Sequence, residues 1–166
     1  MTAIDVLSLY TQLELHGVRI WFDGGWSVDA TLGHQTRPHQ DVDIIIQEKD
    51  LAGLHNLLEP QGYKNVLKDD TRQWNYVLGD ESGHLVDIHV IVFDKDGNGI
   101  YGPVENRVMY PADALTGSGI INGTEVRCLT PEYMVQSRTG YSPRKCDRLD
   151  VAALYERFGI KKPIGY

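Results

Sequence analysis

The spacing of apolar positions predicts an N-terminal helix followed by alternating strands and helices. Thr2 and Asp5 have the spacing of a helix-capping pair, and apolar residues then follow at roughly helical spacing as far as Gly17. Runs of β-branched and aromatic residues predict strands at 19–23, 40–47, 64–68, 73–78 and 85–93. Helical patterns predict helices at 26–32, ended by Gly33, at 49–61 and at 147–158.

Two turn signals add to this pattern near the C-terminal end. Asn122-Gly123 lies between two apolar segments, and both positions of a two-residue hairpin turn need positive φ. The sheet is therefore expected to contain antiparallel strands. Thr130 as N-cap with Pro131 at the first helical position predicts a further helix. We expect residues 1–128 to form a core and residues 129–166 a helical region packed on it within one domain.

Composition and charge narrow the class of protein. A chain of 166 residues with 42% hydrophobic residues can bury the core of one domain. The net charge of −7 argues against a broad surface for nucleic acid or anionic membrane, and suits a cationic small molecule better. Cys128 and Cys146 form no metal or CxxC motif, and neither a leader-like start nor a long apolar span is seen, so a cytoplasmic location is expected.

The candidate chemistry begins with Gly24-Gly25 and with the pair Asp41 and Asp43. Residues without Cβ let backbone N–H groups approach an anion closely, and a following helix start adds partial positive charge. The alternative for the glycine pair is a tight turn with no ligand. Asp41 and Asp43 would share one face of a strand, where two anions are tolerable if they are solvated or hold a divalent cation.

A third acid extends this pair. Asp87 and His89 share one face of a strand that is otherwise apolar on both faces. Mg²⁺ takes a few carboxylates and completes its shell with water and substrate phosphates, so three acids would suit a two-metal site. The alternative for Asp87 is a carboxylate at a strand end that faces solvent.

These motifs resemble those of a known family. Gly-Gly, Asp-x-Asp and a later single Asp are similar to the DNA polymerase β type nucleotidyltransferase superfamily. The segments 24–29 and 35–44 resemble lincosamide nucleotidyltransferases and aminoglycoside 2″-nucleotidyltransferases, and 87–89, 128–132 and 140–151 resemble the lincosamide branch more. The resemblance implies an α+β, polymerase-β-like fold: a mixed sheet with flanking helices and a C-terminal helical region.

The resemblance also implies a reaction. A nucleoside monophosphate would pass from an Mg²⁺-bound NTP, ATP by preference, to a hydroxyl of a small antibiotic, releasing pyrophosphate. Asp41 and Asp43 would bridge two Mg²⁺ ions, and Asp87 would complete one metal shell and act as general base. Monomer and homodimer both stay open.

Other residues receive roles around these acids. Gly24, Gly25, Ser27, Arg37 and Lys145 are candidates for binding the nucleotide, although Ser27 stands where lincosamide enzymes often carry Gly, and Arg37 could instead form a surface ion pair. His39 and His89 are candidates for orienting an acid or contacting substrate, whereas Asp29 is left outside the catalytic set. Four aromatic residues are candidates for the acceptor pocket: Trp74, Tyr76, Tyr101 and Tyr141.

Three alternatives accompany the lincosamide interpretation. An aminoglycoside is the next acceptor class, and a toxin-antitoxin type nucleotidyltransferase would direct the same chemistry at a protein. A nucleotide-binding module without catalysis is the third, and the presence of all three acids speaks against it.

Overall fold

The computed structural model describes residues 1–106 and 108–166. Its α-helices are α1 (Ala3–Leu15), α2 (Gly24–Leu32), α3 (Leu51–Leu58), α4 (Pro131–Gln136) and α5 (Lys145–Phe158). Its strands are β1 (Ile20–Phe22), β2 (Val42–Gln47), β3 (Lys64–Val66), β4 (Asn75–Gly79), β5 (Leu85–Phe93), β6 (Gly99–Tyr101), β7 (Met109–Tyr110), β8 (Gly117–Ile121) and β9 (Thr124–Cys128). Short 3₁₀ helices are η1 (Glu48–Asp50), η2 (Glu59–Gln61), η3 (Val104–Asn106) and η4 (Ala112–Thr116).

One mixed sheet joins the strands. The main path runs β3-β4-β5-β2-β1-β9-β8, and β6 extends from β5 to carry β7. The pairs β2/β5 and β1/β9 are parallel, whereas β1/β2, β4/β5 and β8/β9 are antiparallel. The predicted α+β class with a mixed sheet and flanking helices is confirmed.

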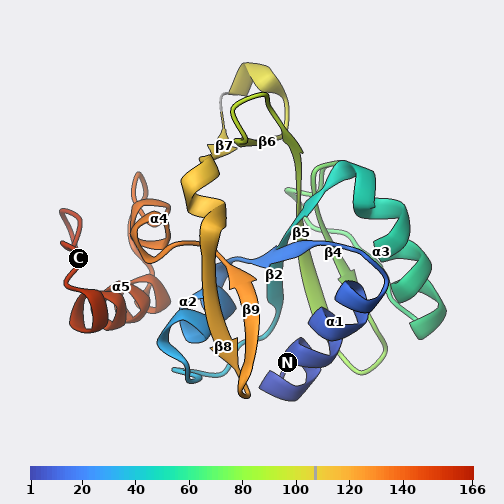
Figure 1. Ribbon diagram of the computed structural model, residues 1–166, viewed down its shortest axis with the longest axis horizontal. Helices are drawn as coiled ribbons and strands as arrows, with labels where there is room; N and C mark the ends of the chain where they lie inside the picture. The colour runs from blue at the N-terminus through green and yellow to red at the C-terminus, as the bar shows by residue number, and fades with distance from the viewer. Residues whose placement is uncertain (107) are drawn as a thin grey trace.

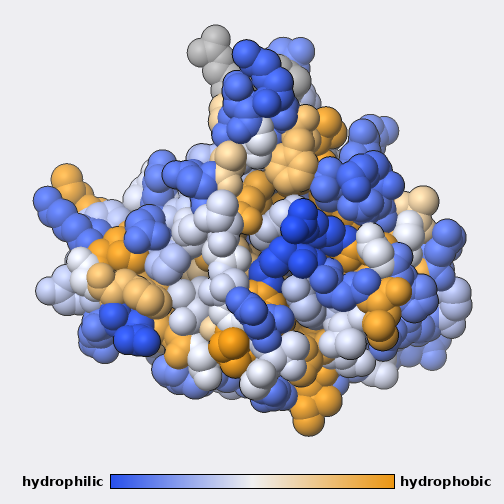
Figure 2. All heavy atoms as spheres, viewed as in Figure 1, coloured by the Kyte–Doolittle hydropathy of each residue, from blue (hydrophilic) through white to orange (hydrophobic). Residues whose placement is uncertain are grey.

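The helices form two groups. In Figure 1, α1 and α3 lie together on one side of the molecule, while α4 and α5 lie beyond α2 on the other. The β6–β7 segment projects from the rest of the molecule (Figure 1). Figure 2 shows hydrophilic residues at the end of this projection. No helix in the described ranges is long and apolar enough to cross a membrane.

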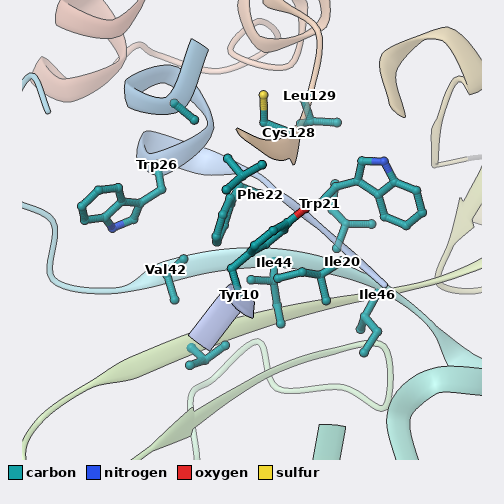
Figure 3. Packing of buried hydrophobic residues seen from close by; sticks show 14 of the residues in the cluster. Tyr10, Ile20, Trp21, Phe22, Trp26, Val42, Ile44, Ile46, Cys128 and Leu129 are labelled. Atoms are coloured by element: carbon teal, nitrogen blue, oxygen red, sulfur yellow. The ribbon is translucent and has the colours of Figure 1, made fainter. Parts of the chain in front are cut away.

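The core lies where the central strands meet α1 and α2. Ile20 and Phe22 of β1 and Ile44 and Ile46 of β2 are fully buried. Tyr10 of α1 packs on Phe22 (Figure 3), and the centroids of the two rings are 5.5 Å apart. This packing fixes β1 and β2, and with them the turn that follows β1 and the acids carried at the start of β2.

Local signals explain most element boundaries. The Thr2–Asp5 capping box is formed, Gly33 ends α2 in the left-handed region, and the hairpin residues Asn122 and Gly123 have φ of 47° and 79°. These three predictions are confirmed. Thr130 lies at the N-cap of α4 as expected, but its side chain makes no capping hydrogen bond.

Some boundaries differ from the predicted ones. Helix α2 begins at Gly24 rather than 26, because the Asp23 side chain accepts a hydrogen bond from the Gly24 N–H and caps it. Strand β2 begins at Val42, so Asp41 precedes the strand and Asp43 lies within it. The predicted helix 49–61 is α-helical only over Leu51–Leu58 and continues in 3₁₀ turns on both sides. The division into 1–128 and 129–166 stays a prediction.

Gly119 offers a test of this packing. A Cβ there would lie 2.3 Å from the carbonyl carbon of Ala30, because β8 rests on the backbone of α2. We expect Gly119→Ala to lower the free energy of unfolding by about 2 kcal/mol in urea denaturation. The neighbouring exposed change Ser118→Ala should leave it unchanged within about 0.5 kcal/mol. Equal stability of the two variants would show that β8 and α2 are not in this contact.

Candidate active site

Parallel pairing of β2 and β5 places two acids face to face. Asp43 is the register partner of Asp87, and Ile45 is the partner of His89. Side-chain ligand atoms of Asp43, Asp87 and His89 all lie within 4.8 Å of one another. Asp41, just before β2, lines the same cleft, which has a volume of about 620 Å³. The three acids expected to act together are therefore brought together.

The electrostatics of this group favour a cation. Burial, followed by the charges of Asp23, Asp41 and Asp87, raises the pKa of Asp43 to about 7. Burial, followed by the charges of Asp41, Asp70 and Asp23, also raises the pKa of Asp87. One Asp87 oxygen, Oδ1, is buried and has no hydrogen-bond partner among the described residues. Opposed carboxylates with an unpartnered buried oxygen fit a divalent ion of the Mg²⁺ type.

The glycine turn is shaped by the side chains that press on it. A Cβ on Gly24, whose φ is +57°, would lie 1.9 Å from Asp43 Oδ2. A Cβ on Gly25 would lie 2.3 Å from His39 Cε1 and 2.8 Å from Arg37 Nη2. Both positions therefore require glycine, because the start of α2 touches β2 and the loop before it. At this helix start the Gly24 N–H donates to Asp23 Oδ1 at 2.7 Å, and the Ser27 N–H donates to the Asp23 carbonyl at 3.1 Å.

Asp23, Tyr110 and His89 form a hydrogen-bonded group next to the acids, and the sequence analysis did not predict this group. Asp23 Oδ2 accepts a hydrogen bond from the Tyr110 hydroxyl at 3.0 Å and lies 3.3 Å from His89 Nδ1. His89 Nε2 lies 3.7 Å from Asp87 Oδ1. Burial alone would lower the pKa of His89, but the hydrogen bond to Asp23 and the surrounding carboxylates raise it to about 9. The available signal for Asp23 was its position immediately before the glycine turn.

Arginines form the opposite wall of the cleft. Arg138, 7% exposed, donates hydrogen bonds to Asp150 Oδ2 at 2.9 Å and to the Gly24 carbonyl at 3.1 Å. Arg37 lies 3.4 Å from the same Asp150 carboxylate, and Arg144 also lines the cleft. Asp150 therefore holds two guanidinium groups beside the glycine turn. Arg138 was missed because only the fold brings the segment that follows α4 to the start of α2.

His39 has a partly different environment from the one predicted. Arg37 Nη1 donates to its Nδ1 at 2.9 Å, so Nε2 carries the proton and donates to Asp29 Oδ2 at 2.5 Å. Asp29 is buried and also accepts hydrogen bonds from the Thr36 N–H and hydroxyl. Asp29, left outside the catalytic set, thus orients His39, and His39 orients Arg37.

Two candidates for nucleotide binding lie outside the cleft. Ser27 is fully buried, and its hydroxyl accepts a hydrogen bond from the Leu129 N–H at 3.1 Å. Its expected phosphate contact is therefore corrected, because its position in α2 turns it into the core. Lys145 is exposed and is not among the residues that line the cleft, whereas its neighbour Arg144 is. A phosphate contact for Lys145 stays a prediction.

The four aromatic candidates are dispersed. Tyr141 lines the large cleft on the arginine side, and Tyr76 lines a smaller pocket on the other side of Asp87. The Tyr101 hydroxyl donates to Asn75 Oδ1 at 2.8 Å, and its ring lies against His89. Trp74 packs partly buried against the core and under Gly102.

Comparison with known proteins agrees with this geometry. Residues 5–154 match the family described as aminoglycoside-2″-adenylyltransferase. A lincosamide resistance protein from Staphylococcus haemolyticus is 27% identical over 150 residues, which cover 90% of this chain and 89% of that protein. A 2″-aminoglycoside nucleotidyltransferase from Escherichia coli is 27% identical over 116 residues, covering 70% of this chain but only 60% of the relative.

Solved structures give the same result for the fold. The lincosamide antibiotic adenylyltransferase LnuA, solved with lincomycin bound, has a TM-score of 0.81 at 25% identity and covers 93% of this chain and 96% of its own. The antibiotic-resistance factor ANT(2″)-Ia has a TM-score of 0.69 at 18% identity, covering 95% of this chain and 84% of its own. The resemblance and the nucleotidyltransferase fold predicted from sequence are confirmed.

The repulsion between the acids predicts an effect of cations on stability. At pH 8, without divalent ions, Asp43→Asn should raise the free energy of unfolding by about 1 kcal/mol and the melting temperature by about 3 °C. Adding Mg²⁺ or Mn²⁺ should stabilise the wild type but not this variant. The stabilisation by Asp43→Asn should be smaller at pH 5 than at pH 8, because the raised pKa of Asp43 leaves its carboxyl group mostly neutral in the folded protein at pH 5.

The matched control for this experiment is Asp113→Asn, which removes an exposed carboxylate in η4. This variant should have the same melting temperature as the wild type, and Mn²⁺ should raise that temperature by the same amount in both. A wild type that melts at the same temperature with and without Mn²⁺ would contradict the cation site.

Proposed function

We propose that this chain, which belongs to the aminoglycoside-2″-adenylyltransferase family, transfers a nucleoside monophosphate from an NTP to a hydroxyl of a lincosamide-type antibiotic. The chain is a nucleotidyltransferase by its family, and pyrophosphate is the second product. The observation that carries the proposal is the opposition of Asp43 and Asp87 beside the glycine turn. A lincosamide is favoured because both lincosamide relatives match over nearly their whole length.

The nucleotide would lie on the arginine side of the cleft. The start of α2 at Gly24 and Gly25, where glycine lets an anion approach the backbone and the helix carries a partial positive charge, suits the triphosphate. Arg37 and Arg144 line this side, and the buried Arg138 carries a further positive charge next to Gly24. A guanidinium fork can bind two phosphate oxygens at once, so this wall would hold the departing pyrophosphate.

The acids would hold the metal. Asp41, Asp43 and Asp87 are the residues proposed to bind two Mg²⁺ ions, with ATP as the preferred nucleotide. Bound Mg²⁺ would supply neutralisation of phosphate charge and alignment of the attacking and leaving oxygens. Glycine at position 24 leaves space for Asp43, since any Cβ there would displace the carboxylate.

Asp87 is proposed as the general base. Its carboxylate would accept the proton of the acceptor hydroxyl while the new O–P bond forms and the bond between the α- and β-phosphates breaks, with pyrophosphate leaving. His89 would orient the Asp87 carboxylate, because Asp23 and Tyr110 hold the imidazole from behind. An NTP bound opposite would face the hydroxyl in line.

An aminoglycoside is the second candidate acceptor. Support comes from the description of the matched family and from the Escherichia coli relative, of which this chain spans 60%. Both acceptor classes are cationic, which agrees with a chain whose net charge is −7.

Pyrophosphate release tests the proposal. The protein would be assayed with Mg²⁺ and each of the four NTPs against a panel of lincosamides and aminoglycosides. We expect release with at least one lincosamide, fastest with ATP, and a product whose mass has increased by one nucleoside monophosphate. Absence of release with every antibiotic would refute the proposed acceptor class.

The same assay tests Asp87. Asp87→Asn should lower kcat by about a hundredfold or more, while the nucleotide still binds through the glycine turn and the arginines. Nucleotide affinity is measured separately by titration calorimetry with a non-hydrolysable ATP analogue. Turnover near the wild-type rate with nucleotide binding retained would exclude Asp87 as the base.

A further inference from the structure

A second, smaller pocket opens on the other side of the acids. It has a volume of about 190 Å³, and Lys68, Asp70, Thr71 and Tyr76 are among its lining residues. Asp41 and Asp87 line this pocket as well as the large cleft, and among the described residues they are the two shared by both. The proposed base therefore stands between two cavities of different character.

We propose that this pocket receives the amine-bearing part of the acceptor and that Asp70 pairs with its ammonium group. The inference rests on the nucleotidyl transfer proposed above and specifies where the acceptor lies and which group selects it. Asp70 lies in the segment between β3 and β4, and sequence analysis gave this residue no role.

The geometry of in-line attack favours binding of the acceptor in the smaller pocket. An attacking hydroxyl must approach the α-phosphorus opposite the leaving pyrophosphate. The arginines that suit pyrophosphate all lie in the large cleft, around the glycine turn. The acceptor must then approach from the far side of Asp87, where the smaller pocket lies.

The walls of the pocket are held in place by hydrogen bonds. Asn75 Nδ2 donates to the Asp70 carbonyl at 3.3 Å, and the Lys68 N–H donates to Thr71 Oγ1 at 2.9 Å. The Tyr76 hydroxyl lies 2.9 Å from His55 Nε2, and the two rings stack with centroids 5.9 Å apart. The pocket is thus formed before any ligand enters, which lowers the cost of ordering it on binding.

The negative charge of the smaller pocket favours a positively charged ligand group. The lining contains three carboxylates, Asp41, Asp70 and Asp87, against one ammonium, Lys68. Asp41 and Asp87 are assigned to the metal, which leaves Asp70 to interact with a second positive charge. Tyr76 offers an aromatic wall for the attached ring.

The test compares Asp70→Asn with Asp69→Asn, which removes a neighbouring exposed carboxylate outside the pocket. For an amine-bearing antibiotic from the panel, Asp70→Asn should raise the KM for the acceptor about fivefold, with kcat and the KM for ATP within about twofold of wild type. Asp69→Asn should match wild type, and Asp70→Glu should keep most of the acceptor affinity. Raising NaCl from about 50 to 500 mM should weaken acceptor binding by wild type more than by Asp70→Asn.

Two results would overturn the inference. One is an unchanged KM for the acceptor in Asp70→Asn, and the other is an equal rise in the KM for ATP. If wild type turns over no antibiotic, calorimetric binding of lincomycin in the presence of Mg²⁺ and a non-hydrolysable ATP analogue decides the question separately. Equal affinity of wild type and Asp70→Asn would then refute the role of Asp70, whereas loss of turnover alone refutes the proposed function.

Discussion

The parallel register of β2 and β5 is the constraint on which the rest of the site depends. It places the carboxylates of Asp43 and Asp87 directly opposite each other in a partly buried setting. Such an arrangement is unfavourable without compensation, since burial and like charge both oppose ionisation. The apolar packing of the strands on which these acids sit supplies the energy that holds them there. The strain of the acid pair is what prepares the site for a cation.

The glycine turn joins this acid pair to the helical C-terminal region. Asp43 occupies the space above Gly24, and the carbonyl of Gly24 accepts a hydrogen bond from Arg138. Arg138 is in turn paired with Asp150 of α5, which also approaches Arg37. The glycine turn, β2 and the arginine wall are therefore held together by close packing and hydrogen bonds, which include that of the Asp23 N–H to the Asp43 carbonyl at 3.0 Å.

The part of this site that could be predicted from sequence is local in the chain. Sequence alone identifies Gly24-Gly25, the Asp41/Asp43 pair and Asp87. A glycine pair, or an acid within a β-forming run, can be recognised from the residues next to it in the chain. Arg138, Asp150 and Tyr110 gave no such signal, since their roles arise from contacts between elements far apart in the chain. Ser27 was misjudged for the related reason that starting α2 at Gly24 turns its hydroxyl into the core.

A crystal structure with Mn²⁺ and a non-hydrolysable ATP analogue tests the central claim most directly. We expect metal ions within coordination distance of carboxylate oxygens of Asp41, Asp43 and Asp87. We also expect the triphosphate over Gly24 and Gly25, on the side of Arg138, with the pocket beside Asp70 left free. Metal bound away from these acids, or a triphosphate on the Asp70 side, would contradict this claim.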